Sequence, residues 1–215
     1  MADIEFPYSV PAVEKRAELI VRNSRFITTI APVFSVEDAR AFIVRIRNEY
    51  NDASHNVPAF IIGNGLSTIM HCSDDGEPSG TAGKPALAVL KGSGLGDVAV
   101  VVTRYFGGTK LGTGGLVQAY ADSVKAILQD LPKAYKMSVH TVMVSLPYNW
   151  VDRIRLKAKN HHGVILEETF TTDVAMVVEF PVPAYPEFER DILESSNGKI
   201  TPLIIETKIQ LFRPE

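Results

Sequence analysis

The residues best suited to chemistry lie in an acidic loop. Three carboxylates fall within four residues there: Asp74, Asp75 and Glu77. Like charges this close repel one another unless cations lie near them. The cluster therefore indicates either a cation site or carboxylates paired with basic side chains. A solvated acidic turn that leads into a helix is the simpler alternative. We expect no bound metal, because the spacing matches no known calcium loop.

A second candidate is the glycine-rich segment that follows Arg104. Five of the nine residues from 107 to 115 are glycines, and Lys110 lies among them. The segment leaves a buried strand and opens a helix, where free backbone N–H groups attract anions and glycine permits close approach. A tight strand-to-helix connection does not account for so many glycines around a lysine. We therefore expect anion binding here. The residues expected to form this site are Gly112, Thr113, Gly114 and Gly115. No Gly-Lys-Ser/Thr closes the segment, so it is not a Walker A motif.

Two further side chains could serve as a base or a nucleophile. His55 follows the first expected helix, where a structural histidine is the more common outcome. Cys72 stands beside His71 but lies in an expected strand without the spacing of a reactive thiol. We keep His55 and the three carboxylates as the candidates for catalysis.

The bulk composition is that of a soluble globular protein. Of 215 residues, 46% are hydrophobic and 22% are charged, so the apolar surface is sufficient to drive folding. No apolar run reaches the roughly 18 residues of a spanning helix, and the N-terminus lacks a signal-peptide pattern. The single cysteine can form no internal disulfide. We therefore expect a cytoplasmic protein without membrane contact. The net charge of −3 requires any nucleic-acid contact to use a local basic patch.

The first half of the chain alternates strand and helix patterns. Strands are expected within residues 17–33, where two meet near Asn23, and at 57–62, 68–72 and 97–103. Helices are expected from an N-cap at Ser35 to about residue 50, over 86–91 and over 116–128. The strand at 97–103 is almost wholly β-branched, which is typical of a strand buried on both faces.

The second half follows a different plan. Strand patterns cover residues 138–146, 164–170, 173–180 and 199–205, and helical patterns cover 150–158 and 185–192. The order β-α-β-β-α-β is the ferredoxin-like split βαβ arrangement. The sequence thus predicts an α/β (α+β) protein with two domains, residues 1–136 and 137–215.

Several motifs, in a fixed order, carry a resemblance to a known family. They are Ser24–Ile27, Asp52–Ala53 with His55, Asp74–Gly83, Val102–Gly108, Lys110–Val117 and Ala119–Tyr120. They closely resemble the IMPACT/YigZ family, and the resemblance covers essentially the whole chain, including the tail found in bacterial members.

The resemblance implies a ribosomal-protein-S5 domain-2-like first domain, shared with translation factors and with small-molecule kinases whose glycine-rich loop holds phosphate. It also implies a ferredoxin-like tail similar to the last domain of elongation factor G. Eukaryotic members regulate translation during amino-acid starvation by competing for the protein that activates a translation-factor kinase, whereas bacterial members have no established activity. The chain departs from the family at Gln118, where Arg or Lys is usual, and at Val57, where Cys is common. It also lacks the extra N-terminal partner-binding domain, so that eukaryotic role is not carried over.

Together these features predict a non-enzymatic, translation-associated protein that binds RNA or a ribosome-linked partner. Lys84, Arg104 and Lys110 would meet phosphate, and the N–H groups from Gly112 to Gly115 would cradle it. The three carboxylates would orient these cations or hold a hydrated cation. The alternative is an enzyme that acts on a phosphorylated small molecule in the same cleft, with His55 or a carboxylate as base. We expect no cofactor, and we expect the acidic loop, His55 and the glycine-rich segment to line one cleft.

Overall fold

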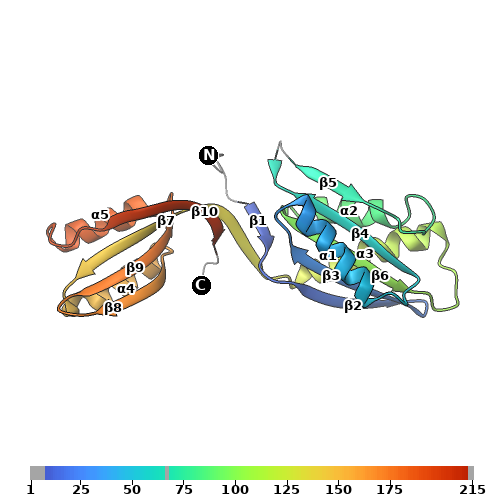
Figure 1. Cartoon of the computed structure of the whole chain (residues 1–215), viewed down its shortest axis with the longest axis horizontal. Helices are drawn as coiled ribbons and strands as arrows, with labels where there is room; N and C mark the ends of the chain where they lie inside the picture. Colours follow the sequence, from blue (N-terminus) through green and yellow to red (C-terminus); the bar gives the residue numbers. More distant parts are fainter. Residues whose placement is uncertain (1–7, 66–67, 213–215) are drawn as a thin grey trace. The chain divides into compact units, whose positions relative to one another are not determined.

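The computed structural model describes residues 8–65 and 68–212. The chain forms two compact units, with the boundary between Lys133 and Ala134, close to the boundary expected after residue 136. Each unit contains its own sheet and helices (Figure 1). Across the described residues, no helix combines the length and apolar character needed to cross a membrane.

The N-terminal unit is built on an antiparallel sheet with strand order β2-β3-β6-β4-β5. These strands are β2 (Lys15–Val21), β3 (Ser24–Pro32), β4 (His55–Ile62), β5 (Ile69–Cys72) and β6 (Val98–Tyr105), and β1 (Tyr8–Pro11) precedes them. The β2–β3 turn at Arg22 and Asn23 has positive φ at both residues, as a tight hairpin requires.

The central strand β6 is buried on both faces, as its run of β-branched residues predicts. Ala99 and Val101 pack beneath α1 (Val36–Glu49) on one face of the sheet. Val100 and Val102 pack on the other face against α2 (Gly83–Gly92) and α3 (Gly112–Gln129). Figure 1 shows α1 crossing the sheet on one side, with α2 and α3 on the other.

The C-terminal unit follows the expected β-α-β-β-α-β order. It comprises β7 (Lys133–Leu146), a short 3₁₀ helix η2 (Tyr148–Trp150), α4 (Val151–Asn160), β8 (Val164–Phe170), β9 (Val174–Pro181), α5 (Tyr185–Ser195) and β10 (Leu203–Phe212). The strands lie in the order β10-β7-β9-β8, the ferredoxin-like arrangement. The core contains Phe180 and Phe188, whose ring centroids are 4.1 Å apart. The mixed α/β class predicted from the sequence is confirmed.

The structure corrects several element boundaries. The last strand begins at Leu203 rather than Lys199, because residues 196–200 continue a turn in which the Ile200 N–H donates to Ser196 Oγ at 3.1 Å. Strand β7 begins at Lys133 rather than Ser138. Helix α3 begins at Gly112, so the last residues of the glycine-rich segment form its first turn rather than a preceding loop.

The C-terminal unit has a core of its own, so it should fold without the rest of the chain. We expect residues 134–215, expressed alone, to give one cooperative thermal transition by circular dichroism, with residues 8–133 as the matched fragment. A gradual, non-cooperative loss of signal from residues 134–215 would contradict the assignment of an independent unit.

Candidate functional site

A buried ion pair lies at the centre of the candidate site. Glu77 Oε1 accepts hydrogen bonds from Arg104 Nη1 at 2.6 Å and from the Tyr120 hydroxyl at 2.8 Å. Glu77 and Arg104 are only 8% and 5% exposed. Burial, followed by the charge of Glu77 and this hydrogen bond, raises the pKa of Tyr120 far above its ordinary value. The hydroxyl therefore stays protonated and serves as a donor.

The same arginine connects the ion pair to the start of the glycine-rich segment. The Arg104 guanidinium lies 5.5 Å and 5.6 Å from the ring centroids of Phe26 and Phe106, within the range of cation–π attraction. Ser24 Oγ accepts from Arg104 Nη2 at 3.4 Å and from the Gly107 N–H at 3.2 Å. A Cβ at Gly107 would lie 2.1 Å from the carbonyl of Asn23. Only glycine lets the segment approach the β2–β3 turn this closely.

His55, the first residue of β4, is oriented by the acidic loop. Its Nδ1 lies 2.8 Å from the backbone oxygen of Asp75, and because a carbonyl can only accept, Nδ1 carries a hydrogen. Its Nε2 lies 3.8 Å from Glu77 Oε2. The His55 side chain is 23% exposed, so solvent reaches the ring. Such an oriented histidine beside a carboxylate has the geometry of a general base.

Asp75 joins the acidic loop to α1 and β4. Its Oδ1 lies 2.6 Å from Arg47 Nη2, and its Oδ2 accepts from the Asn56 N–H at 2.6 Å. The Asn56 side chain in turn accepts from Thr103 Oγ1 at 2.7 Å and donates to the Tyr50 carbonyl at 3.0 Å. These contacts fix the loop against two strands.

Asp74 holds the beginning of α2. Its carboxylate accepts from the N–H groups of Gly80, Ala82 and Gly83 at 2.8, 3.1 and 2.8 Å, so it satisfies donors that a helix start otherwise leaves free. Burial alone would raise the pKa of the Asp74 carboxyl, but these N–H groups and the charge of Lys84 lower it below its ordinary value. Asp74 therefore has a structural role as an ionised cap.

The three carboxylates do not converge on a cation. Each binds different partners: Asp74 the start of α2, Asp75 Arg47 and β4, and Glu77 Arg104 and Tyr120. Among the described residues, no three His, Cys, Asp or Glu side chains gather closely enough to hold a metal ion. The expectation that these residues orient nearby cations matches the contacts of Asp75 and Glu77.

Arg104 is not available to a phosphate as the sequence suggested. It is buried, and its charge is matched by Glu77. The β-strand pattern around it gave no sign that its side chain points inward. We therefore assign Arg104 to positioning the glycine-rich segment and do not include it among the residues proposed to contact an anion.

The exposed part of the glycine-rich segment lies at the start of α3. Leu111 occupies the N-cap position, and no side chain caps the helix. Lys110 and Lys84 are exposed, and neither has a hydrogen bond or an ion pair with another described residue. Gly112 has φ +74°, which favours glycine, but Gly114 has no such constraint, and a Cβ there would meet no atom within 4 Å. The fold therefore does not require glycine at position 114.

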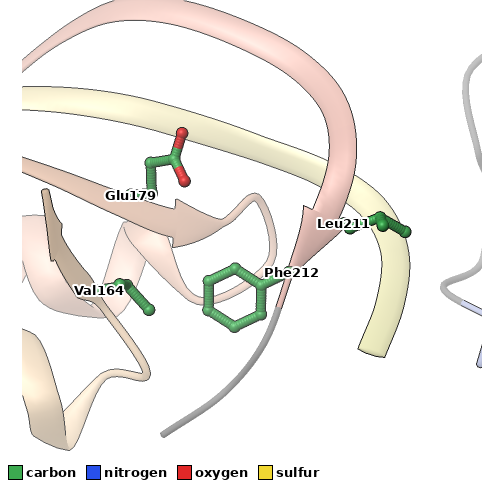
Figure 2. A pocket seen from close by; sticks show the side chains of 4 residues that line it. All are labelled: Val164, Glu179, Leu211 and Phe212. Atoms are coloured by element: carbon green, nitrogen blue, oxygen red, sulfur yellow. The ribbon is translucent and has the colours of Figure 1, made fainter. Parts of the chain in front are cut away.

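The structure brings His55, Glu77 and Arg104 together, as the sequence predicted, but extends this cluster only to Gly107. For Lys110 and the residues from Gly112 to Gly115, a shared cleft with His55 stays a prediction. A separate pocket of about 270 Å³ lies in the C-terminal unit, lined by Val164, Glu179, Leu211 and Phe212 (Figure 2). Its acidic residue pairs with Lys208 at 3.1 Å and with Gln210, so its charge is already matched.

Comparison with known proteins places these features in a family. Residues 22–128 match the model of the Impact N-terminal domain, and residues 144–199 match a domain of unknown function, DUF1949. The chain is 37% identical to the IMPACT family member YigZ of Escherichia coli over 92% of its own length and 97% of that relative. The chain belongs to the IMPACT family.

Two further similarities define the extent of this relationship. A crystal structure described as that of a hypothetical protein is 36% identical, with a TM-score of 0.60, over 93% of this chain and 98% of that one. Protein IMPACT of Xenopus laevis is 32% identical over 107 residues, which are 48% of this chain and 34% of that protein. The Impact N-terminal domain spans His55, the acidic loop and the glycine-rich segment.

Sequence reasoning identified the IMPACT motifs but missed several roles within them. The helical pattern over residues 116–128 gives no sign that Tyr120 binds a carboxylate, but its hydroxyl donates to Glu77. Ser24, Arg47 and Asn56 were assigned no role, although all three support the site. The sequence offered one signal, a tyrosine among the apolar residues of a helix expected to pack on the core. A hydroxyl buried there needs a hydrogen-bond partner.

Replacing Glu77 should show how strongly the free energy of unfolding depends on the buried Glu77–Arg104 pair. We expect Glu77→Gln to lower the free energy of unfolding by about 3–5 kcal/mol, because Arg104 is left buried without a counter-charge. The exposed Asp122–Lys125 pair, 3.0 Å apart, is the control, and Asp122→Asn should cost at most about 1 kcal/mol. Urea denaturation measures both. Equal, small losses would show that the ion pair is not central to the fold.

Asp74 should contribute to stability only when it is ionised. Because its pKa is lowered in the folded state, its contribution is complete above its ordinary value of 3.8 and is lost as the pH falls through the folded-state value. We expect Asp74→Asn to be less stable than the native chain at pH 7, with the difference shrinking on acidification below about pH 4. A difference that grows on acidification would contradict the capping role.

Proposed function

We propose that this IMPACT family member is a translation-associated regulatory protein that binds RNA, free or within the ribosome, at the start of α3. We call this surface the α3 anion face, made of Lys110 and the residues from Gly112 to Gly115. The observation that carries the proposal is the start of α3, which is formed by glycines, has no side-chain cap and follows an exposed lysine. Among the residues that the structure describes, this lysine has no hydrogen bond or ion pair.

The chemistry of this face suits phosphate. Free N–H groups in the first turn of a helix point outward, and the helix dipole places partial positive charge there. Gly114 has open space at its Cβ position and no positive φ, so glycine there is explained by close approach of a ligand to the backbone. Lys110 adds a full charge, and Lys84 is a second exposed cation at the start of the neighbouring helix α2.

The buried cluster supports this face by fixing it in advance. Gly107 is bound to Ser24, which is bound to Arg104, which is paired with Glu77. A segment that is already ordered loses less conformational entropy when it binds a ligand. In this proposal the cluster of Ser24, Glu77 and Arg104 orders the glycine-rich segment but does not contact the ligand.

The net charge of −3 limits how RNA can bind. A face with one or two lysines and one helix start can make only about two to four phosphate contacts. Binding should be weak and strongly salt-dependent. The translation context rests on family membership: the matching domain is shared with protein IMPACT, and the family resemblance implies regulation of translation.

One observation favours a second function. His55 is held by the Asp75 carbonyl and faces Glu77 at 3.8 Å, which is an oriented base beside a carboxylate. An enzyme acting on a phosphorylated small molecule would use the α3 anion face for the phosphate and His55 for proton transfer. If this alternative is correct, a phosphorylated small molecule would raise the melting temperature of the folded chain, because it binds the folded state. RNA would not bind and would leave the melting temperature unchanged.

Removing the charge of Lys110 should weaken RNA binding in a salt-dependent way. We expect Lys110→Ala to lower affinity and to reduce the log–log salt slope by roughly one unit, because one phosphate contact is lost. Gln118→Arg should raise the affinity for RNA and steepen the log–log salt slope. Filter binding of single-stranded RNA from 50 mM salt upward measures them, with Lys91→Ala at the far end of α2 as the matched control. Absence of RNA binding at 50 mM salt in all variants would exclude direct RNA binding.

A substitution at Gly114 should change RNA affinity without lowering the stability of the fold. We expect Gly114→Ala to leave the melting temperature unchanged or raise it, because alanine is about 1 kcal/mol better than glycine in a helix. The same change should weaken RNA binding by roughly tenfold, or about 1.4 kcal/mol, because the added methyl blocks the backbone. Paired melting and binding measurements check this. Unchanged binding would show that the first turn of α3 is not the contact surface.

A further inference from the structure

A groove lies on the other side of the N-terminal sheet, between α1 and the edge strand β5. It has a volume of about 560 Å³. Arg40, Val44 and Arg47 line it from one face of α1, and Ile69, Met70 and His71 line it from β5. We call it the α1–β5 groove. Because α1 and α3 pack on opposite faces of the sheet, it is separate from the α3 anion face.

The charge of the groove is positive. Among the described residues that line it, two are arginines and one is a histidine, and none is acidic. Arg47 is already paired with Asp75 at 2.6 Å. Arg40 is exposed and has no hydrogen bond or ion pair with any other described residue. Arg40 thus leaves an unmatched positive charge at the groove.

The groove also presents apolar surface that the fold leaves uncovered. Val44 is 55% exposed and Ile69 is 52% exposed. Met70, whose side chain lies on the opposite face of β5, is 41% exposed. Proteins commonly protect an edge strand with lysine, proline or an inward-facing charge. The sequence of β5, Ile69-Met70-His71-Cys72, contains none of these, and the strand limits its exposed edge only by its length of four residues.

The free edge of β5 offers backbone groups in a regular pattern. The Ser73 N–H donates to the Pro58 carbonyl at 3.2 Å, so residues 58 and 73 form a hydrogen-bonded position of the antiparallel ladder. Hydrogen-bonded and non-hydrogen-bonded pairs alternate. Cys72 opposite Ala59 and Met70 opposite Ile61 are therefore non-hydrogen-bonded pairs. The N–H and C=O groups of Met70 and Cys72 point away from β4, toward the free edge.

We propose that β5 binds an extended acidic segment of a partner protein, which adds a further strand to the sheet beside the α1–β5 groove. The N–H and C=O groups of Met70 and Cys72 form its main-chain hydrogen bonds, as in other strand-addition complexes. Alternate side chains of the segment face the groove. Its aspartate or glutamate side chains face the groove and pair with Arg40, and its apolar side chains, on the opposite face of the sheet, cover Met70.

The charge of Arg40 and the outward backbone of β5 define the test. The probe is a fluorescein-labelled, end-capped octapeptide of alternating valine and glutamate, compared with the same peptide carrying lysine in place of glutamate. We expect fluorescence anisotropy to show that the full chain binds the glutamate peptide and not the lysine peptide. Arg40→Glu should weaken this binding at least tenfold. The control Arg190→Glu makes the same charge change on α5 of the other unit and should leave binding unchanged.

Met70→Pro tests the backbone contact, because proline removes an N–H that points away from β4 and keeps the β4–β5 ladder. We expect it to abolish binding of the glutamate peptide. Amide hydrogen exchange on the native chain gives a second measurement: the peptide should slow exchange at Met70 and Cys72. Equal binding of both peptides, or exchange at these two amides that the peptide does not change, would overturn the proposal.

Discussion

The pair formed by Glu77 and Arg104 is the interaction on which the candidate site depends. A buried carboxylate and a buried guanidinium are tolerable only together, because either one alone would lie in a poorly solvating interior. The pair spans 27 residues of sequence and connects the acidic loop to the central strand β6. Tyr120 adds α3 to the same carboxylate, and Ser24 adds the β2–β3 turn and Gly107. The elements that flank the glycine-rich segment are therefore held together by one charged contact.

This arrangement divides the polar and charged groups of the motifs into two classes. The acidic residues serve the interior: Asp74 caps α2, Asp75 fixes the loop on β4, and Glu77 neutralises Arg104. The groups that we propose meet a ligand are neutral backbone N–H groups at the start of α3, with exposed Lys110 before it and Lys84 at the start of α2. A charge-rich motif thus leaves the proposed α3 anion face with little side-chain charge. Such a face suits a ligand that brings its own negative charge, and it explains why a chain of net charge −3 could still contact RNA at one place.

Much of the fold could be predicted from local patterns. The β-branched run of β6, the Ser35 cap, at which Oγ accepts from the Asp38 N–H, and the ferredoxin-like order were all legible in the sequence, and the structure confirms them. The boundaries of α3 and β10 were not, since glycines obscured a helix start and a turn extended past Gly198. The role of Arg104 could not be predicted, because the direction of its side chain depends on Glu77 and Phe26, which are distant in the sequence. The α1–β5 groove left no motif, since it arises from packing between an exposed helix face and a short edge strand.

The most direct test of the α3 anion face is a nuclear magnetic resonance titration of the uniformly ¹⁵N-labelled chain with a short single-stranded RNA at low salt. If the account is correct, the largest amide shifts fall at Lys110, Thr113, Gly114 and Gly115, with smaller changes at Gly107. The amides of β5 and α1 stay unchanged, which separates this face from the α1–β5 groove. Shifts absent from the first turn of α3, or centred on His55 instead, would contradict the claim that this helix start is where the protein meets RNA.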